Sequence, residues 1–233
     1  MSVALAAEKK GKSCHVLDMG FLDYAKAHRM QTRLTRLRLN HEIGDILILV
    51  EHPPVFTLGR HRGAENILVS EDILKKNGIK VFSTERGGDV TYHGPGQLVG
   101  YPILNLRNHC ANISEYLRKI EEVIILTLKD FGVRARRRPK YPGVWAEEKK
   151  IASIGVAIKQ FRITYHGFAL NVNTDISPFR LIHPCGIRNL EVTSLAKLLG
   201  YSPEMIEVKQ KVISNFADTF AVRMSAGKRN KQF

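Results

Sequence analysis

The residues best suited to chemistry lie in segment 181–186, which reads Leu-Ile-His-Pro-Cys-Gly. Within it, Cys185 stands between one residue that restricts the backbone and one that frees it. Pro184 fixes its own φ and disfavours helix at His183, whereas Gly186 can adopt angles closed to other residues. The spacing therefore predicts a tight loop that carries a thiol, and loops on rigid scaffolds are where reactive groups concentrate.

These residues alone leave two other interpretations of Cys185 open. A free cysteine commonly behaves as a small buried hydrophobe without a chemical role. Alternatively, His183 and Cys185 could belong to a metal site, because imidazole and thiolate are common zinc ligands. The chain has no Cys-x-x-Cys or paired-histidine spacing that would complete such a site, so we predict no metal.

The composition is that of an ordinary globular protein. The chain has 233 residues, of which 44% are hydrophobic and 25% charged, enough for one large core or two small ones. The richest apolar run, at 46–50, has the length of a strand and not of a membrane span. Residues 1–12 resemble neither a secretory signal nor a transit peptide. The three scattered cysteines, Cys14, Cys110 and Cys185, fit a reducing compartment, and we expect a cytoplasmic protein without membrane contact.

The charge is strongly basic. Lysine and arginine exceed aspartate and glutamate by 36 − 22 = 14 residues, which favours acidic partners. The cations are densest at 134–140 and again at 33–38, although such runs are often only solvated faces. They are not interleaved with aromatic residues as in an RNA-binding signature, so we expect no nucleic acid partner.

Apolar periodicity predicts strands and helices that alternate along the chain. The run at 45–51 is typical of a strand buried on both faces. The predicted strands are 15–18, 45–51, 55–58, 79–83, 98–106, 150–158 and 164–172, and the predicted helices are 23–39, 70–76, from 112 or 114 to 128, 193–199 and 202–222. Because no linker or repeat divides the chain, we predict one α/β domain over 15–222. A flexible N-terminus at 1–14 and a disordered basic tail at 223–233 would flank it.

A second unusual segment is 86–97, with four glycines at Gly87, Gly88, Gly94 and Gly96. Glycine lets the backbone come close to a ligand. The segment leads into a strand and not a helix, so it is not a dinucleotide or P-loop fingerprint. A mobile hairpin remains the alternative interpretation.

Together, several motifs resemble the lipoyl(octanoyl) transferases, which move an octanoyl group from acyl-carrier protein to a lysine of a lipoyl domain. The motifs lie in the same order as in that family, at 50–59, 86–97, 142–145, 150–155, 166–171 and 183–186. The resemblance runs from about residue 15 to residue 215. It implies a mixed β-sheet flanked by helices, a fold shared with biotin and lipoate-protein ligases, and no cofactor.

The resemblance implies that Cys185 is the acyl-thioester nucleophile and Lys150 its partner. Thiols titrate near pH 8.5 and only the thiolate attacks well, so a neighbouring lysine that takes the proton or stabilises the anion would activate the sulfur. Lys149 competes for this role, but Lys150 directly precedes the Ile-Ala-Ser-Ile-Gly motif. The implied substrate-binding residues are Arg86, Gly87, Gly88, Asp89, Val90, Thr91, Tyr92, His93, Ser153, Ile154, Gly155, Gly167, Phe168 and Ala169.

The implied partners are octanoyl-acyl-carrier protein as donor, and as acceptors the lipoyl domains of 2-oxoacid dehydrogenases and the glycine cleavage H protein. These proteins are typically acidic, which would give the basic run at 134–140 a steering role. Two rival functions stand against this one, and the first belongs to proteins of the same implied fold. An ATP-dependent lipoate- or biotin-protein ligase would need no cysteine nucleophile, and a carrier-binding module without catalysis would need neither Lys150 nor Cys185.

Overall fold

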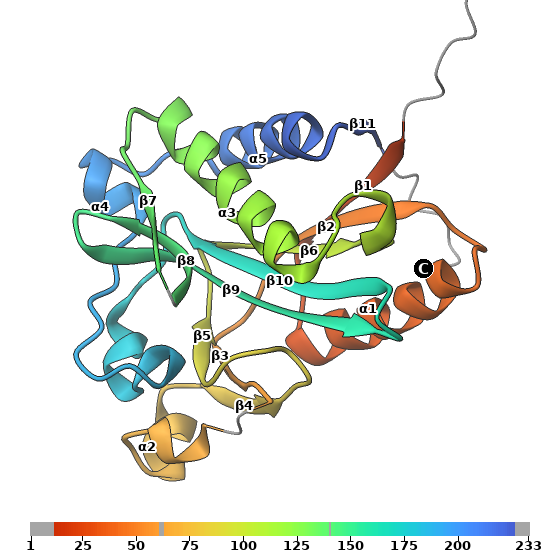
Figure 1. Ribbon diagram of the computed structural model, residues 1–233. Coiled ribbons are helices and arrows are strands. Elements are labelled where there is room, and N and C mark those ends of the chain that lie inside the picture. The colour runs from red at the N-terminus through yellow and green to blue at the C-terminus, as the bar shows by residue number, and fades with distance from the viewer. Residues whose placement is uncertain (1–11, 61–62, 140, 227–233) are drawn as a thin grey trace, which may run out of the picture.

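The computed structural model describes residues 12–60, 63–139 and 141–226 (Figure 1). Five α-helices lie in these ranges: α1 Tyr24–Leu39, α2 Glu71–Lys76, α3 Ile113–Asp130, α4 Leu195–Leu199 and α5 Met205–Phe220. The strands are β1 Ser13–Phe21, β2 Asp45–Glu51, β3 Val55–Leu58, β4 Lys80–Ser83, β5 Thr91–His93, β6 Gln97–Ile103, β7 Arg136–Arg138, β8 Tyr141–Ala146, β9 Lys149–Lys159, β10 Ile163–Asn171 and β11 Arg223–Ala226.

Two sheets organise the molecule. The larger has the strand order β11-β1-β2-β6-β10-β9-β8-β7, and the smaller has the order β4-β3-β5. In the larger sheet β11, β1 and β2 run parallel to one another, whereas each pairing from β2 through β7 is antiparallel. The predicted mixed α/β domain is therefore confirmed.

Helices cover both faces of the larger sheet (Figure 1): α3 and α5 lie over one face and α1 over the other. Strand β2 shows how its sequence is suited to this position. Leu47 and Leu49 pack in the core beneath α3 and α5, while Ile46, Ile48 and Val50 pack on the α1 side. An uninterrupted apolar run is needed because successive side chains of a strand point to opposite faces.

Polar side chains begin two of the long helices where the sequence predicts a start. The Asp23 carboxylate accepts hydrogen bonds from the backbone N–H groups of Ala25 and Lys26 at the start of α1. The Asn112 side chain accepts one from Glu115 N–H at the start of α3. These bonds satisfy N–H groups that have no partner within the helix.

The structure corrects the predicted chain ends. Strand β1 begins at Ser13, inside the segment expected to be flexible, and β11 occupies the first four residues of the expected basic tail. Strand β11 pairs with β1 in parallel, in the register Ser13↔Arg223. An edge strand gains its stability from backbone pairing and needs little apolar sequence, so composition suggested disorder. Residues 1–11 and 227–233 lie outside the described residues. Among the described residues, no helix combines the length and apolarity needed to cross a membrane.

A glycine at a strand crossing provides a test of this packing. Gly100 of β6 pairs with Phe168 of β10, and a Cβ at Gly100 would collide with the Phe168 ring. We expect Gly100→Ala to lower the free energy of unfolding by about 1–3 kcal/mol, the usual scale for an overpacked core. Urea unfolding would measure the loss. Gly44→Ala is the matched control, because its Cβ would meet only His15 at 3.9 Å. Equal stability in the two variants would contradict the close approach.

Candidate active site

The structure brings together the two residues that the sequence singled out for chemistry. Lys150 lies near the start of β9, and Cys185 lies in a single 3₁₀ turn, Pro184–Gly186, far away in sequence. Lys150 Nζ is 3.2 Å from Cys185 Sγ. This is hydrogen-bonding contact between an amine and a sulfur, the geometry that a nucleophile and its activating group require.

The turn that carries Cys185 is held in an unusual backbone conformation. Cys185 has φ 58° and Gly186 has φ 70°. A left-handed conformation costs a non-glycine residue roughly 1–2 kcal/mol. The turn is fixed by backbone bonds from Cys185 N–H to Val90 O at 2.9 Å and from His183 N–H to Asn66 O at 2.8 Å. The predicted tight loop is confirmed, and its shape is set by segments elsewhere in the chain.

Lys150 is buried and firmly held, with only 3% of its surface exposed. Its backbone pairs with the segment that follows Cys185, donating to Glu191 O at 2.8 Å and accepting from Thr193 N–H at 3.0 Å. Lys150 Nζ lies 5.0 Å from the centre of the Trp145 ring, within cation–π range. Gly143, at φ 135°, leaves room for the end of the lysine side chain.

Lys149 occupies a different environment. Its side chain is 45% exposed and its Nζ lies 3.3 Å from a carboxylate oxygen of Glu191. The alternation of side chains along a strand sends neighbours to opposite sides. Of the two candidate lysines, Lys150 is therefore the one that reaches the thiol.

A small cavity of about 40 Å³ lies against Cys185. Most of the predicted substrate-binding residues line it: Arg86, Gly87, Gly88, Asp89, Thr91, His93, Ser153, Ile154, Gly155, Gly167, Phe168 and Ala169. The glycine-rich segment is thus part of a pocket wall, as its close backbone approach predicted.

Two predicted residues of that segment do not line the cavity. Val90 is fully buried in the core of the smaller sheet, and the Tyr92 ring packs against Phe56 and Phe179 in the same core. Residues 91 and 93 line the cavity, so the alternation along β5 turns Tyr92 away from it. The resemblance implied every residue from 86 to 93 as part of the site. Only every second side chain of a strand can face one pocket.

Four lining residues were not predicted: Tyr24, Val99, Tyr101 and His166. His166 belongs to the motif at 166–171, and a histidine in such a motif could have indicated a place in the site. Tyr24 comes from α1, the helix that apolar periodicity predicts over 23–39. Nothing in its local sequence connects it to residues of β6 and β10.

Arg86 is a buried cation at this cavity, with 7% of its surface exposed. Its guanidinium donates to both Thr57 Oγ1 and the Thr57 carbonyl, at 2.9 and 2.5 Å from Nη2, and to Gly87 O at 3.1 Å from Nη1. Burial lowers the pKa of Arg86 from its ordinary value. The fixed orientation makes Arg86 a source of positive potential beside the sulfur.

Beneath the cavity lies a network of buried neutral histidines. His52 Nδ1–H donates to Leu22 O at 2.7 Å, so its Nε2 accepts from Tyr101 OH at 2.8 Å. His93 Nδ1–H donates to Gln97 Oε1 at 2.7 Å. Burial lowers the pKa of His52 to about 4 and the pKa of His93 to about 3. Both rings are therefore neutral at pH 7 and act as fixed dipoles, not charges.

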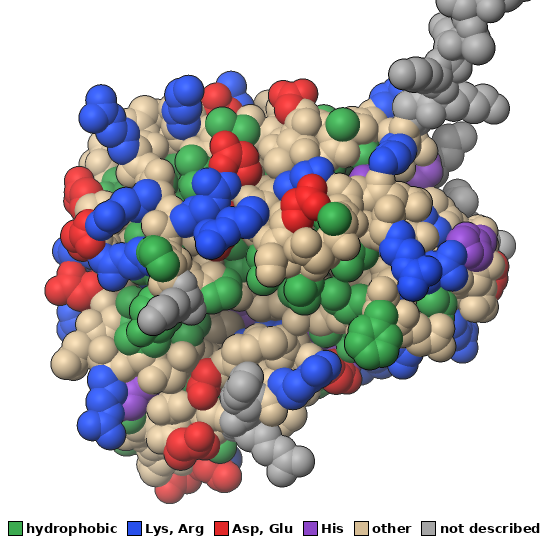
Figure 2. All heavy atoms as spheres, in the orientation of Figure 1, with side chains coloured by type: hydrophobic (Ala, Val, Ile, Leu, Met, Phe, Trp, Pro, Cys, Tyr) green, Lys and Arg blue, Asp and Glu red, His purple; other side chains and the backbone are tan. Residues whose placement is uncertain are grey.

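The basic run at 134–140 is largely engaged with acidic side chains, except that Lys140 lies outside the described residues. Arg136 and Arg138 both pair with Glu148, and Arg137 pairs with Glu121 at 3.1 Å. Figure 2 shows blue side chains with red ones among them at the upper left, over the region of α3 and β7. These ion pairs neutralise part of the charge of the run. Its role in steering acidic partners stays a prediction.

Comparison with known proteins places this arrangement in a family. The family model "Lipoyl protein ligase A/B catalytic domain" matches residues 23–217. The chain is 48% identical over 206 residues to an octanoyltransferase of Desulforamulus reducens, covering 88% of this chain and 90% of that protein. It is also 48% identical over 216 residues to an octanoyltransferase of Solibacter usitatus, covering 93% of this chain and 97% of that protein.

Solved structures agree on the fold. A putative lipoate protein ligase from T. acidophilum with bound lipoic acid has a TM-score of 0.74 at 19% identity, covering 94% of this chain and 91% of that one. A biotin protein ligase from Aquifex aeolicus has a TM-score of 0.53 at 13% identity, covering 89% and 69%. The chain therefore belongs to the lipoyl protein ligase A/B catalytic domain family. Within it, the resemblance to the octanoyltransferases is confirmed by the identity to these curated relatives.

The neutral histidines make stability depend on pH. As the pH falls below about 6.5, the unfolded chain protonates His52 and His93 while the folded chain does not, until the pH nears 4 for His52 and 3 for His93. The unfolded state then binds more protons, so stability falls with falling pH, by up to about 1.4 kcal/mol per pH unit for each histidine. We expect His52→Gln to flatten this slope in urea unfolding between pH 7 and pH 5. The exposed His41→Gln is the control, and parallel slopes for His52→Gln and the parent would refute the assignment.

Proposed function

We propose that Cys185 carries an octanoyl group as a thioester between a donor acyl-carrier protein and a lysine of a lipoyl domain. Octanoyl transfer in protein lipoylation is the activity of this acyltransferase, as the octanoyltransferases of 48% identity over most of the chain indicate. One observation supports the covalent route above the others: Lys150 Nζ lies 3.2 Å from Cys185 Sγ, beside a cavity that the cysteine itself lines.

In the first step the Cys185 sulfur attacks the carbonyl carbon of the donor thioester. Lys150 takes the thiol proton, the new sulfur–carbon bond forms, and the carbon–sulfur bond to the donor breaks. The protonated Lys150 then returns its proton to the departing donor thiolate. One thioester replaces another of similar energy, so this step needs no external energy source.

In the second step the amine of the acceptor lysine attacks the acyl-enzyme. A carbon–nitrogen bond forms, the bond to Cys185 breaks, and the proton lost by the amine passes to Lys150 and on to the leaving sulfur. An amide is more stable than a thioester, so the reaction runs downhill without ATP. A single buried lysine thus serves both half-reactions.

The cavity beside Cys185 lies where the acyl chain would bind. Val99, Ile154 and Phe168 give it apolar surface, while Gly87 and Gly88 allow the backbone to approach the chain and its carbonyl. The Arg86 guanidinium is positioned to favour negative charge that develops on the carbonyl oxygen. We propose these groups as the acyl site.

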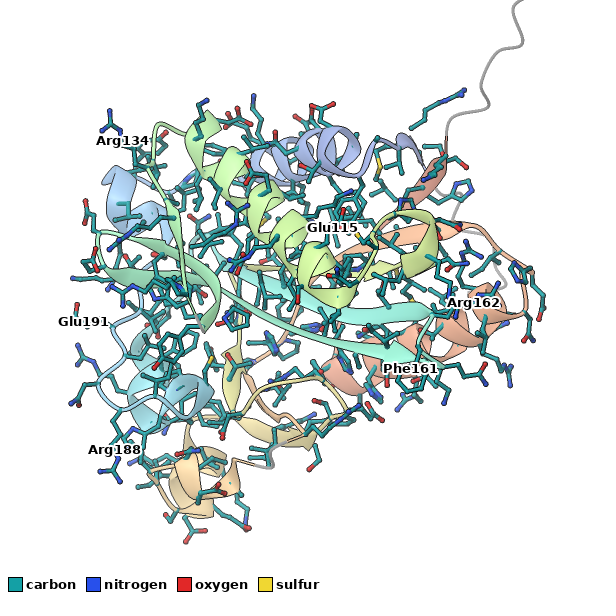
Figure 3. All side chains as sticks on the ribbon, viewed as in Figure 1. Glu115, Arg134, Phe161, Arg162, Arg188 and Glu191 are labelled. Atoms are coloured by element: carbon teal, nitrogen blue, oxygen red, sulfur yellow. The ribbon has the colours of Figure 1, made fainter. Side chains whose placement is uncertain are left out.

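The donor and acceptor would approach over the segment that follows Cys185. Arg188 and Glu191 point outward from this segment (Figure 3), and a broad groove lined by Arg180, His183 and Lys197 adjoins the turn. Cations at a rim steer acidic partners. We propose acyl-carrier protein as donor and lipoyl domains as acceptors on this side, and the cytoplasm as the compartment, which three free thiols support.

Replacing Cys185 tests the covalent intermediate. After incubation with octanoyl-carrier protein and no ATP, the intact mass of the parent should rise by one octanoyl group, because the thiol is acylated. Cys185→Ala should show no increase while its unfolding curve remains that of a folded protein. Cys110→Ala, which removes a buried thiol elsewhere, serves as the control and should be acylated like the parent. Acylation of Cys185→Ala would refute the thioester mechanism, and transfer that depends on ATP would favour a ligase.

Replacing Lys150 separates two roles for the amine. Arginine keeps a permanent charge but cannot accept a proton at working pH. We expect both Lys150→Arg and Lys150→Ala to slow single-turnover transfer by about 10²- to 10⁴-fold, the scale of a lost acid–base group. Lys149→Ala is the neighbouring control and should turn over like the parent. Near-parent transfer by Lys150→Arg would show that charge alone suffices, and near-parent transfer by Lys150→Ala would remove Lys150 from the mechanism.

A further inference from the structure

Three potential metal ligands other than Cys185 converge at the wall of the acyl cavity. His28 lies on α1, Glu85 lies between β4 and β5, and His166 lies on β10. His28 Nε2 is 3.0 Å and His166 Nε2 is 3.5 Å from the same carboxylate oxygen, Glu85 Oε2. One ligand atom from each residue lies within 4.8 Å of the others. Sequence spacing could not reveal this cluster, because its members come from three separate elements.

The helix α1 fixes the position of His166. The backbone N–H of His166 donates to Gln31 Oε1 at 2.9 Å instead of to a neighbouring strand. His166 has φ 54° in the middle of β10, a left-handed conformation that a non-glycine residue adopts only when its surroundings impose it. Gln31 and His28 are three residues apart on α1 and so lie on the same face. One helix face therefore holds the His166 backbone and places a second imidazole beside its ring.

The His166 ring has capacity for a ligand that the protein does not supply. The side chain is 2% exposed, and within the described part of the chain neither ring nitrogen makes a hydrogen bond. A buried polar group without a partner is costly and calls for an explanation. Its Nε2 lies 3.5 Å from Glu85 Oε2, an oxygen that His28 Nε2 already contacts at 3.0 Å.

We propose that His28, Glu85 and His166 bind one divalent transition-metal ion, with Zn²⁺ as the best match. Two imidazole nitrogens and one carboxylate oxygen form a donor set that suits zinc and its neighbours, whereas Mg²⁺ and Ca²⁺ prefer oxygen ligands alone. Bonds of about 2.0–2.2 Å in a tetrahedron set ligand atoms roughly 3.3–3.5 Å apart. The separations of 3.0 and 3.5 Å from Glu85 Oε2 are close to that value.

The cluster also has an open side. The side chains of His28 and Glu85 are 16% and 54% exposed, so an ion can enter from solvent and keep water as its fourth ligand. His166 and Tyr24 line the acyl cavity, and Tyr24 lies one turn before His28 on α1. The ion would tie α1, the segment before Arg86 and β10 together, and so would brace one wall of that cavity.

Titration with Co²⁺ and Zn²⁺ after chelator treatment tests this site. The full chain should bind one Co²⁺ with visible d–d absorption of the intensity of a four-coordinate ion, and Zn²⁺ should displace it. His28→Gln and Glu85→Gln should each weaken the affinity at least about 10-fold, because a ligand is lost. Zn²⁺ should also raise the melting temperature of the parent and not of His28→Gln. His41→Gln, which changes an exposed histidine elsewhere, is the matched control.

The thiol is the competing ligand, and its contribution can be separated. Cys185→Ser and the parent should bind Co²⁺ with the same affinity and the same d–d spectrum. Neither should show a thiolate-to-cobalt charge-transfer band. Binding that disappears in Cys185→Ser and persists in His28→Gln would overturn the proposal. So would equal affinity of the parent and His28→Gln, or no binding by the parent. None of these readouts depends on acyl transfer, so the proposal stands or falls separately from the proposed function.

Discussion

The backbone hydrogen bond from Cys185 N–H to the Val90 carbonyl, at 2.9 Å, is one of two that fix the turn, and the candidate site depends on it. It ties the turn that carries Cys185 to the glycine-rich segment and so sets the sulfur against the cavity. The same stretch of chain is held again at its far end, where Glu191 and Thr193 pair with the Lys150 backbone. A segment fixed at both ends keeps thiol and amine in register across the sheet, and the left-handed angle at Cys185 is the strain that this arrangement imposes.

The side chains beneath the cavity are polar but mostly uncharged. The proposed acyl chain would need an apolar pocket, yet Tyr24, His52, His93 and Tyr101 place several polar atoms close to the cavity. His52 hydrogen-bonds to Leu22 and Tyr101, and His93 to Gln97. Both rings do so in their neutral form, so they bring no charge to the pocket. Arg86 and Asp89 are the charged side chains among the described lining residues, and the Arg86 guanidinium is occupied by Thr57.

Much of this structure could be predicted from the sequence, and the rest could not for identifiable reasons. The run at 45–51 predicted its strand because burial on both faces leaves a continuous apolar pattern. Pro184 and Gly186 predicted the turn at the thiol because their backbone limits are local. Tyr24 and His166 were missed because tertiary contact between α1 and β10 decides their role. The prediction of disorder was wrong for residues 223–226, because edge pairing with β1 is not visible in composition. The resemblance at 86–97 also implied Val90 and Tyr92 as substrate-binding residues, but their side chains pack in the core of the smaller sheet and do not line the cavity.

The arginines of β7 have one more consequence, which concerns association between molecules. Strand β7 is an outer edge of the larger sheet and only three residues long. Unpaired edge strands are templates on which a second copy can add, and short edges with charged side chains resist this. Arg136, Arg137 and Arg138 are long side chains held across the edge by glutamates of α3 and of the β8–β9 turn. They cover the strand with hydrated charge, so this edge is protected against the strand-by-strand stacking that leads to fibres.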